Sequence, residues 1–426
     1  MDNLNVALLS DAFPPALDGV SNVVKNYADI LSKNGNPVSV LTPQWPGADD
    51  SGLPYDVIRY PSLDTREQIG YVTGIPFMPK LVEKLRPASP DILHSHCPTV
   101  SQILGMELAP VLDVPLVFTY HTKYDQEIRR EFRGKLIQDN VARILVDAVS
   151  MSDEVWTVSR GAGENLRSMG YEGEYFVMPN GSDMPLGQVD DETMRSAVNG
   201  YDLPETVPVF LFVGRMIFYK GQRLILEALE GLHSQGVDFR MVFVGAGEDL
   251  PEMQALANQL GIGEKVIFTG TVRDREKLRG WYRRADLLVF PSTFDTNGLV
   301  VREAAASSTP AVLVKDSCAA EGVIDGQNGY LVTESASSLA VKLYQLIQNR
   351  DRLQETGERA KKELYLSWED AVKMAEGRYR SVLERYRSGD CQPKSTRKRV
   401  HDDLFRIIGD LLEAREELKS GEWRIL

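Results

Sequence analysis

Short apolar runs rich in β-branched residues alternate with helix-length segments along most of the chain, and this alternation limits the fold more than any other feature. When strand, helix and strand follow one another in this way, the strands pair in parallel and the helices cover the sheet. Six strands are expected in the first half, at 5–10, 37–41, 91–95, 115–120, 153–158 and 175–178. Six more are expected in the second half, at 207–214, 239–245, 265–270, 286–290, 310–314 and 329–332. The predicted fold class is therefore α/β, with two Rossmann-like, doubly wound units in tandem.

A turn-rich and acidic stretch at 179–192 separates the two sets of strands. It predicts a first domain at 1–190 and a second domain at 191–366. In doubly wound sheets, ligands bind beyond the carboxyl ends of the strands. We therefore expect a binding site in a cleft between the two units.

Composition narrows the class of protein. The 426 residues carry a net charge of -13, and the pI is about 5.1, so nucleic acid is not expected as a partner. The three cysteines, Cys97, Cys318 and Cys391, lack metal-binding spacing, which predicts reduced thiols. No apolar run reaches the ~20 residues of a membrane span, and the first strand follows Met1–Asn5 directly. These features predict a cytoplasmic protein.

The end of the chain differs from the rest. Residues 388–399 form a polar, basic linker before a charged helix that ends near 426. This helix carries a heptad-like apolar stripe at Leu404, Ile407, Leu411, Ala414 and Leu418. The stripe is consistent with packing on its own domain and equally with a homodimer or partner contact, whereas its many acids disfavour a membrane.

The stretch GRMIFYKGQRL, at 214–224, follows a predicted strand directly. Arg215 offers a planar fork to phosphate oxygens and Lys220 a compact charge, so the two side chains suit a diphosphate. An ordinary surface turn is the alternative. VGAGED, at 244–249, is a second glycine-rich turn, for which a phosphate loop and a tight turn are both open.

The stretch FDTNGLVVREAAA, at 294–306, holds Asp295 and Glu303 around an Asn-Gly turn and a helix start. A helix that begins near Leu299 would present free N–H groups and a positive dipole end to an anion. The two carboxylates would then reach hydroxyls at different parts of one extended ligand. The alternative is that Asp295 caps the helix and Glu303 is a buried partner for Arg302 or another base.

In this order and spacing, GRMIFYKG, VIFTGTV and PSTFDTNGLVVREAAA resemble the donor half of retaining family 4 glycosyltransferases with the GT-B fold. The first half agrees in SDAFPPALDGVSN, TYHTKYD, VSR and MPNGSD. SWEDAVKMAEGRYRSVLERY resembles the family's closing helices, which predicts a segment at 367–387 that returns to the first domain. The resemblance covers most of residues 1–386.

The resemblance implies roles for the second domain. Arg215 and Lys220 would hold the nucleotide diphosphate, Glu303 the ribose hydroxyls and Asp295 the hydroxyls of the donor sugar. Amides near the helix start would cradle the distal phosphate, and a turn would face the base. These backbone positions are Asn297, Gly298 and Leu299 for the phosphate, and Gly270 and Val272 for the base.

In the first domain, the resemblance implies that Gly19 approaches the phosphate and that His121 lies near the reacting sugar. Ser159 and Arg160 would line the cleft. For His121 the alternative is a strand-end histidine bonded to the backbone.

Three departures from the family pattern stand out. Asp295 replaces the family's first Glu and is one methylene shorter. Tyr219 replaces the Glu before the motif lysine, which removes an acidic partner. Asp18 and Gly19 replace paired glycines, and an aspartate beside a phosphate is unfavourable unless it points away.

The resemblance implies transfer of a hexose from a nucleotide diphosphate sugar, most commonly a UDP-sugar, with retention of anomeric configuration. No carboxylates are arranged like a glycosidase's acid and nucleophile, which favours front-face displacement. Arg215 and Lys220 would take the place of a metal, so no metal or cofactor is expected. The alternatives are a sugar-nucleotide epimerase of similar fold and a non-catalytic, nucleotide-sugar-binding partner subunit.

The acceptor is less constrained. ILHSHCP and TYHTKYD resemble the diacylglycerol glucosyltransferase branch, which implies a glycerolipid acceptor and peripheral membrane contact. Two basic segments could provide this contact, a predicted amphipathic helix at 76–87 and the stretch 123–135. Their basic side chains are Lys80, Lys84, Arg86, Arg129, Arg130, Arg133 and Lys135. A solvated basic face and a soluble acceptor remain the alternatives.

Overall fold

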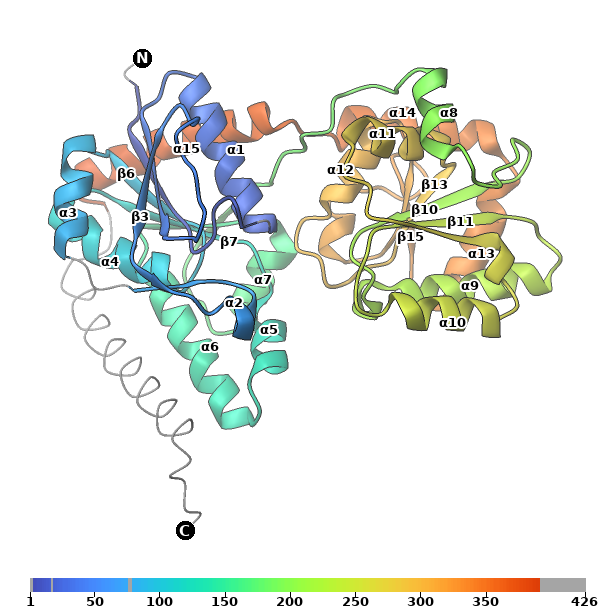
Figure 1. Cartoon of the computed structure of the whole chain (residues 1–426), viewed down its shortest axis with the longest axis horizontal. Coiled ribbons are helices and arrows are strands. Elements are labelled where there is room, and N and C mark those ends of the chain that lie inside the picture. Colours follow the sequence, from blue (N-terminus) through green and yellow to red (C-terminus); the bar gives the residue numbers. More distant parts are fainter. Residues whose placement is uncertain (1–2, 17, 76–78, 391–426) are drawn as a thin grey trace, which may run out of the picture. The chain divides into compact units, whose positions relative to one another are not determined.

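Two parallel sheets form the framework of the chain, which a computed structural model describes for residues 3–16, 18–75 and 79–390 (Figure 1). The chain divides into two units. Unit 2 contains Ser159–Gly161 and Pro179–Ala371, and unit 1 contains the other described residues. The predicted tail helix, Cys391 and residues 76–78, which open the predicted amphipathic helix at 76–87, lie outside the described residues.

The sheet of unit 1 has seven strands in the order β3-β2-β1-β6-β7-β8-β9, and every neighbouring pair is parallel. Its strands are Val6–Leu9 (β1), Val38–Pro43 (β2), Asp56–Tyr60 (β3), Ile92–Ser95 (β6), Leu116–Tyr120 (β7), Glu154–Thr157 (β8) and Tyr175–Val177 (β9). A small antiparallel pair, Ser62–Leu63 (β4) and Thr73–Gly74 (β5), lies outside this sheet.

The sheet of unit 2 has six parallel strands in the order β12-β11-β10-β13-β14-β15. They are Val209–Val213 (β10), Arg240–Val244 (β11), Val266–Gly270 (β12), Leu287–Phe290 (β13), Ala311–Val314 (β14) and Tyr330–Val332 (β15). Counted within each sheet, both orders contain 3-2-1-4-5-6, the arrangement of dinucleotide-binding folds. The predicted α/β class and all twelve predicted strands are confirmed.

Helices cover the sheets. Those before the final helix are Gly19–Lys33 (α1), Arg66–Ile69 (α2), Pro79–Leu85 (α3), Val100–Leu112 (α4), Tyr124–Glu131 (α5), Lys135–Ser150 (α6), Arg160–Ser168 (α7), Asp191–Val198 (α8), Gln222–Ser234 (α9), Leu250–Gln259 (α10), Arg275–Arg284 (α11), Leu299–Ala306 (α12), Ala336–Ile347 (α13) and Arg350–Glu363 (α14). In unit 2, α8, α11 and α12 lie over one face of the sheet and α9, α10 and α13 over the other (Figure 1). No helix in the described parts of the chain is both long and apolar enough to cross a membrane.

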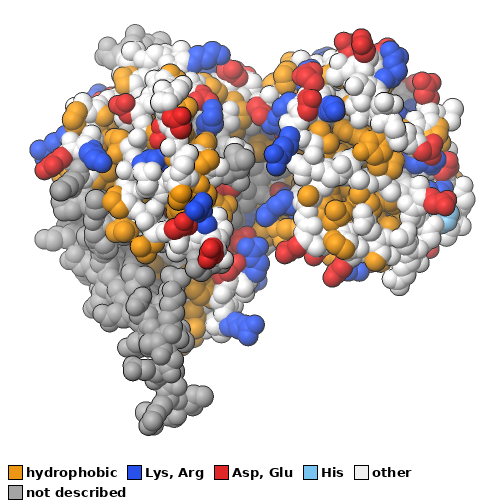
Figure 2. All heavy atoms as spheres, viewed as in Figure 1, with side chains coloured by type: hydrophobic (Ala, Val, Ile, Leu, Met, Phe, Trp, Pro, Cys, Tyr) orange, Lys and Arg blue, Asp and Glu red, His pale blue; other side chains and the backbone are white. Residues whose placement is uncertain are grey.

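The central strands are buried on both faces, as expected for parallel sheets between helix layers. Every residue of β1, β2, β10 to Phe212, and β13 is buried. On the surface, charged side chains of both signs are interspersed with apolar ones on the face drawn in Figure 2. Helix α3 contributes Leu81 and Leu85 to the core of unit 1, so these apolar side chains of the predicted amphipathic helix at 76–87 face inward.

The last described helix, Trp368–Arg387 (α15), is anchored to unit 1 by one buried carboxylate. Glu154 opens β8, and its side chain is only 2% exposed. It accepts hydrogen bonds from Nε and Nη2 of Arg378, both at 2.6 Å, and from Arg385. The indole of Trp156 donates to the same carboxylate at 2.6 Å. A buried charge is stable only when paired and hydrogen-bonded, so this network fixes the rotation of α15.

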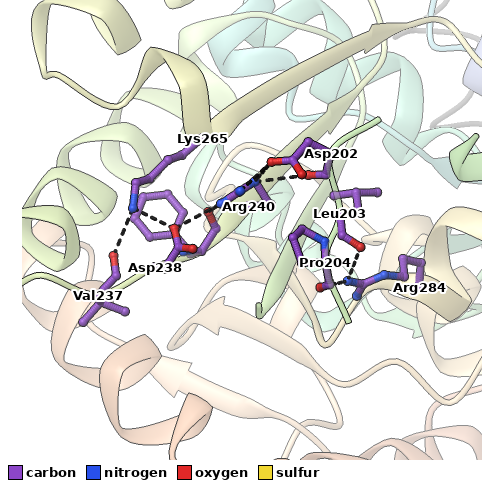
Figure 3. Close-up of polar contacts among 9 residues, drawn as sticks. Asp202, Leu203, Pro204, Val237, Asp238, Arg240, Lys265 and Arg284 are labelled. Carbon is purple, nitrogen blue, oxygen red and sulfur yellow. Dashed lines mark hydrogen bonds and ion pairs between the residues drawn. The ribbon is translucent and has the colours of Figure 1, made fainter. Parts of the chain in front are cut away.

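The amino edge of the second sheet carries a different set of ion pairs (Figure 3). Arg240, the first residue of β11, donates to Asp202 and Asp238, and Lys265 donates to Asp238 at 2.8 Å. Arg284 donates to the carbonyls of Leu203 and Pro204 at 3.2 and 2.8 Å. These contacts tie the segment 202–204 to the sheet, so the basic side chains of this edge serve the fold.

Candidate functional site

The loops after β10, β11 and β13 meet at the carboxyl edge of the second sheet, opposite the amino edge described above. The loop after β10 contacts the loop after β11 through Gly214 N, which donates to Val244 O at 3.0 Å, and through Met216 N, which donates to Ala246 O at 3.0 Å. A Cβ atom on Gly245 would lie 1.9 Å from the carbonyl oxygen of Gly214. Close backbone packing therefore explains the glycines of VGAGED, which supports the tight-turn alternative.

Lys220 and Asp295 form the ion pair that joins the loops after β10 and β13. The Lys220 Nζ atom lies 2.8 Å from Asp295 Oδ1, and the two side chains are 12% and 23% exposed. The second oxygen of Asp295 accepts from Ser292 Oγ at 2.6 Å. Strand order reverses between β10 and β13, where ligands of doubly wound sheets bind. Two residues 75 positions apart are thus brought together at the expected place.

Arg215 is exposed beside this pair. Its Nη2 donates to the hydroxyl of Tyr219 at 3.1 Å, and the Tyr219 ring packs on Phe294 with centroids 4.4 Å apart. Among the residues that the structure describes, no carboxylate forms an ion pair with Arg215. The replacement of the family's glutamate by Tyr219 therefore gives Arg215 a neutral partner, and its charge is not compensated there.

Helix α12 begins at Leu299, as the sequence predicts. Gly298 precedes it as the N-cap with φ of 61°, and a Cβ atom there would lie 2.8 Å from the Cβ atom of Ala319. The alternative in which Asp295 caps this helix is wrong, because Gly298 occupies the N-cap position. The Asp295 carboxylate instead accepts from Lys220 and Ser292. Asn297 Oδ1 accepts a long bond from Arg302 Nε at 3.4 Å.

Glu303 lies one turn into α12 and is 12% exposed. One oxygen accepts from Tyr282 at 2.8 Å and the other from Arg275 Nη1 at 3.3 Å, while Arg275 also pairs with Asp183. Burial raises the pKa of Glu303 above its usual range. Glu303 is thus a buried partner of a base, and that base is Arg275; Arg302 instead donates to the carbonyl at the end of α14. The ribose-binding role stays a prediction.

The turn after β12 lies on the same edge. Gly270 has φ of 72°, and its carbonyl oxygen accepts from Gly245 N at 2.9 Å. Val272 is partly buried against the core of unit 2. The contact with a nucleotide base that the resemblance implies for this turn stays a prediction.

In unit 1, His121 follows β7 and is 7% exposed. Its Nε2 atom lies 3.0 Å from Nδ1 of His96, and the two rings stack at an interplanar angle of 19°. Burial lowers the pKa of His121 to about 3. Burial also lowers the pKa of His96 well below its usual value, and the neighbouring His94 and His121 lower it further. Both rings are therefore neutral near pH 7.

The segment that follows β1 leads into a capped helix, α1. Asp18 Oδ1 accepts from Ser21 N at 2.6 Å and so caps α1. Gly19, the first residue of α1, is exposed, and a Cβ atom there would meet nothing within 4 Å. The Asp18 carboxylate is thus committed to its own helix. At the start of α7, Ser159 is buried and Arg160 is exposed.

Several polar partners in these clusters were not predicted. Ser292 donates to Asp295, Arg275 and Tyr282 donate to Glu303, and Asp183 pairs with Arg275. No local pattern marks Arg275 or Tyr282. His96 had a signal, because the alternation in HSH places His94 and His96 on one side of an extended segment. Within the described ranges, no group of three or more His, Cys, Asp or Glu side chains could hold a metal ion.

Comparison with known proteins agrees with this architecture. The model of Glycosyltransferase Family 4 matches residues 17–184, and the model of Glycosyl transferases group 1 matches residues 195–363. The chain belongs to the GT-B glycosyltransferases. The resemblance found in the sequence is thereby confirmed at the level of family, fold and general activity.

The relatives include enzymes named for lipid products. Alpha-monoglucosyldiacylglycerol synthase from Streptococcus pneumoniae is 24% identical over 325 residues, which cover 72% of this chain and 70% of the relative. The synthase of this name from Acholeplasma laidlawii is 24% identical over 362 residues, with 82% and 90% covered. Among solved structures, HepE from Anabaena in complex with UDP has a TM-score of 0.72 at 18% identity, with 88% of this chain and 99% of that chain covered. This likeness supports the fold.

The loop contacts yield a prediction about Gly245. Gly245→Ala should destabilise unit 2 by roughly 3 kcal/mol or more, because φ is 143° and the new Cβ atom would overlap Gly214 O. Gly236→Ala is the matched control: φ is 75°, but nothing lies within 4 Å, so about 1 kcal/mol of backbone strain is expected. Urea unfolding followed by circular dichroism measures both. Equal effects of the two substitutions would contradict the proposed loop packing.

Proposed function

We propose that this glycosyltransferase moves a hexose from a UDP-sugar to an acceptor hydroxyl, with retention of anomeric configuration and without a metal. The observation that carries the proposal is the Lys220–Asp295 pair beside exposed Arg215, at the carboxyl ends of β10 and β13. This arrangement offers two cations to a diphosphate where strand order reverses.

Charge supports binding of the diphosphate at this edge. Arg215 has a neutral hydrogen-bond partner, so its guanidinium can pair with phosphate oxygens without first leaving a carboxylate. Asp295 holds Lys220 in place by an ion pair. The first backbone amides of α12 lie at the end of the loop that carries Asp295. A helix start and two cations together stabilise a leaving diphosphate, which is the task that a metal performs in other enzymes.

The two carboxylates suit hydroxyl groups. Asp295 already accepts from Lys220 and Ser292, but a carboxylate offers about four lone-pair sites, so sugar hydroxyls can add to these bonds. Glu303 has the same capacity beside its bonds to Tyr282 and Arg275, which supports the assignment to the ribose. Because these carboxylates are engaged, neither is a good nucleophile for a covalent sugar intermediate.

Front-face displacement follows from these roles. The acceptor hydroxyl forms its bond to the anomeric carbon on the face from which the phosphate oxygen departs, and its proton passes to that phosphate oxygen. Arg215 and Lys220 stabilise the charge on the leaving group. His121 is neutral at pH 7, so it contributes orientation and a hydrogen bond to the sugar without repelling developing positive charge.

The comparisons support the choice of donor and acceptor. Solved structures of HepE with UDP and with UDP-glucose have the same fold as this chain. Two relatives are named for a monoglucosyldiacylglycerol product, which supports a glycerolipid acceptor. We therefore propose UDP-glucose and diacylglycerol as the first pair of substrates to test.

The product reports the mechanism. With UDP-glucose and diacylglycerol in mixed micelles, the wild-type chain should form an α-linked glucolipid, and excess EDTA should change the rate by less than about twofold. Proton NMR of the purified product gives the anomeric coupling. A β-linked product would contradict retention, and loss of the rate in EDTA would contradict metal independence. Absence of transfer to any hydroxyl acceptor would favour a binding subunit.

Membrane contact is proposed for the α5–α6 tip, which we define as residues 129–137. Each of its residues is exposed, and it joins α5 to α6, which lie side by side (Figure 1). The tip presents Phe132, Leu136 and Ile137, of which Leu136 is 76% exposed. Four basic side chains and one acidic side chain surround them. An exposed apolar group with basic neighbours suits an anionic lipid surface, since lipid tails take up the former and headgroups pair with the latter.

Ion pairs sharpen this assignment. Arg129 pairs with Asp125, and Arg130 pairs with Glu127 and Glu131, so their charges are partly compensated. In the described chain no ion pair involves Arg133 or Lys135, which flank the apolar residues directly.

Vesicle binding tests the α5–α6 tip. Leu136→Glu should lower the fraction bound to sedimented vesicles of anionic phosphatidylglycerol by roughly tenfold, because burial of a leucine contributes ~1.5–3 kcal/mol. Val341→Glu is the control, since Val341 is a 57% exposed apolar residue on α13. Neutral phosphatidylcholine vesicles should bind the wild type more weakly. If Leu136→Glu binds as well as Val341→Glu, the tip is not the contact.

A further inference from the structure

Two buried histidines, His94 within strand β6 and His96 directly after it, have no role in the proposed mechanism. His94 uses both ring nitrogens: Nδ1 lies 2.6 Å from the hydroxyl of Tyr379, and Nε2 lies 2.7 Å from Oγ1 of Thr119. It therefore links β6 to α15 and β7 as part of the fold. His96 differs, because only one of its nitrogens has a partner.

His96 reaches His121 through Nδ1, at 3.0 Å from Nε2 of that ring. Its own Nε2 is buried and has no hydrogen-bond partner among the described residues. The ring cannot easily turn away, because it packs on His94 with centroids 4.0 Å apart and on the edge of Tyr27 at 5.6 Å. His96 is 1% exposed.

Two neutral imidazoles share one hydrogen bond only if one donates and the other accepts. If His121 donated, the proton of His96 would lie on Nε2, where a buried N–H group would have no protein acceptor. An unpaired buried donor costs about 1–3 kcal/mol, and such donors are rarer than unpaired acceptors. If His96 donates from Nδ1, its Nε2 leaves only an unused lone pair. The contacts favour the second arrangement.

We propose that His96 is a positioning residue that donates its Nδ1–H to Nε2 of His121 and thereby holds the His121 proton on Nδ1. The inference rests on the proposed role of His121 at the donor sugar. Which ring nitrogen carries the proton decides whether that face of His121 donates or accepts a hydrogen bond. A fixed tautomer and a fixed ring plane make this choice before the sugar arrives, in the way that a buried partner orients other functional histidines.

Two substitutions separate this role from simple packing. His96→Leu fills similar space but removes the donor, whereas the amide of His96→Asn can donate from nearly the position of Nδ1. His96→Leu should lower kcat by about 10- to 100-fold with KM for the sugar nucleotide changed less than about threefold, and His96→Asn should recover most of the loss. In a His121→Ala background, His96→Leu should add little.

The tautomer itself is measured by long-range nitrogen–proton NMR correlation of histidine-labelled protein, which has five histidines to assign. The wild type and His96→Asn should carry the His121 proton on Nδ1, and His96→Leu should shift it toward Nε2. A wild-type proton on Nε2 would overturn the inference, as would equal kcat for His96→Leu and His96→Asn. This spectrum needs no turnover, so the inference can fail or stand separately from the proposed function. Should His96→Leu not fold, the wild-type and His96→Asn spectra still decide.

Discussion

The ion pair between Lys220 and Asp295 is the contact on which the carboxyl edge of the second sheet depends. It joins two loops that leave neighbouring strands on either side of the point where strand order reverses. The parallel sheet supplies this closeness, because the carboxyl ends of β10 and β13 open on the same edge. Ser292 fixes the second oxygen of Asp295, so the carboxylate and the ammonium group are held in one geometry before a ligand binds.

Charge is used differently at the two edges of this sheet. At the amino edge, Arg240 and Lys265 both pair with Asp238, and Arg240 also pairs with Asp202, which ties the segment 202–204 to the sheet. At the carboxyl edge, Arg215 meets a tyrosine hydroxyl, and its charge is available to an anion. The replacement of a family glutamate by Tyr219 is therefore compatible with the proposed diphosphate role. The Asp18 carboxylate accepts from Ser21 N and caps its own helix, α1.

The framework was predictable because buried parallel strands are apolar on both faces and stand out between turn residues. The edge strand β3 escaped prediction, since DVIRY carries two charged residues in five and only its last residue is buried. The motifs correctly predicted that Lys220 and Asp295 lie at the carboxyl edge of the second sheet and that α12 begins near Leu299. The partner of Glu303 was not predicted. Arg275 lies on another helix, and no spacing along the chain links it to α12. Long-range polar partners depend on helix packing, which local patterns do not encode. His96 was the exception, since its alternation with His94 predicts that both rings lie on one side of an extended segment.

Nucleotide binding by the wild type, Lys220→Ala and Lys265→Ala tests the central claim most directly. Lys265 is the matched control, because it is also a largely buried lysine paired with an aspartate, but it lies at the amino edge. At about 100 times the dissociation constant, UDP should stabilise the wild type and Lys265→Ala by ~2.7 kcal/mol in a thermal melt, while GDP and ADP do so less. Lys220→Ala should lose most of this stabilisation. An equal shift in all three proteins, or no shift with any nucleotide, would contradict a diphosphate site at the carboxyl edge of the second sheet.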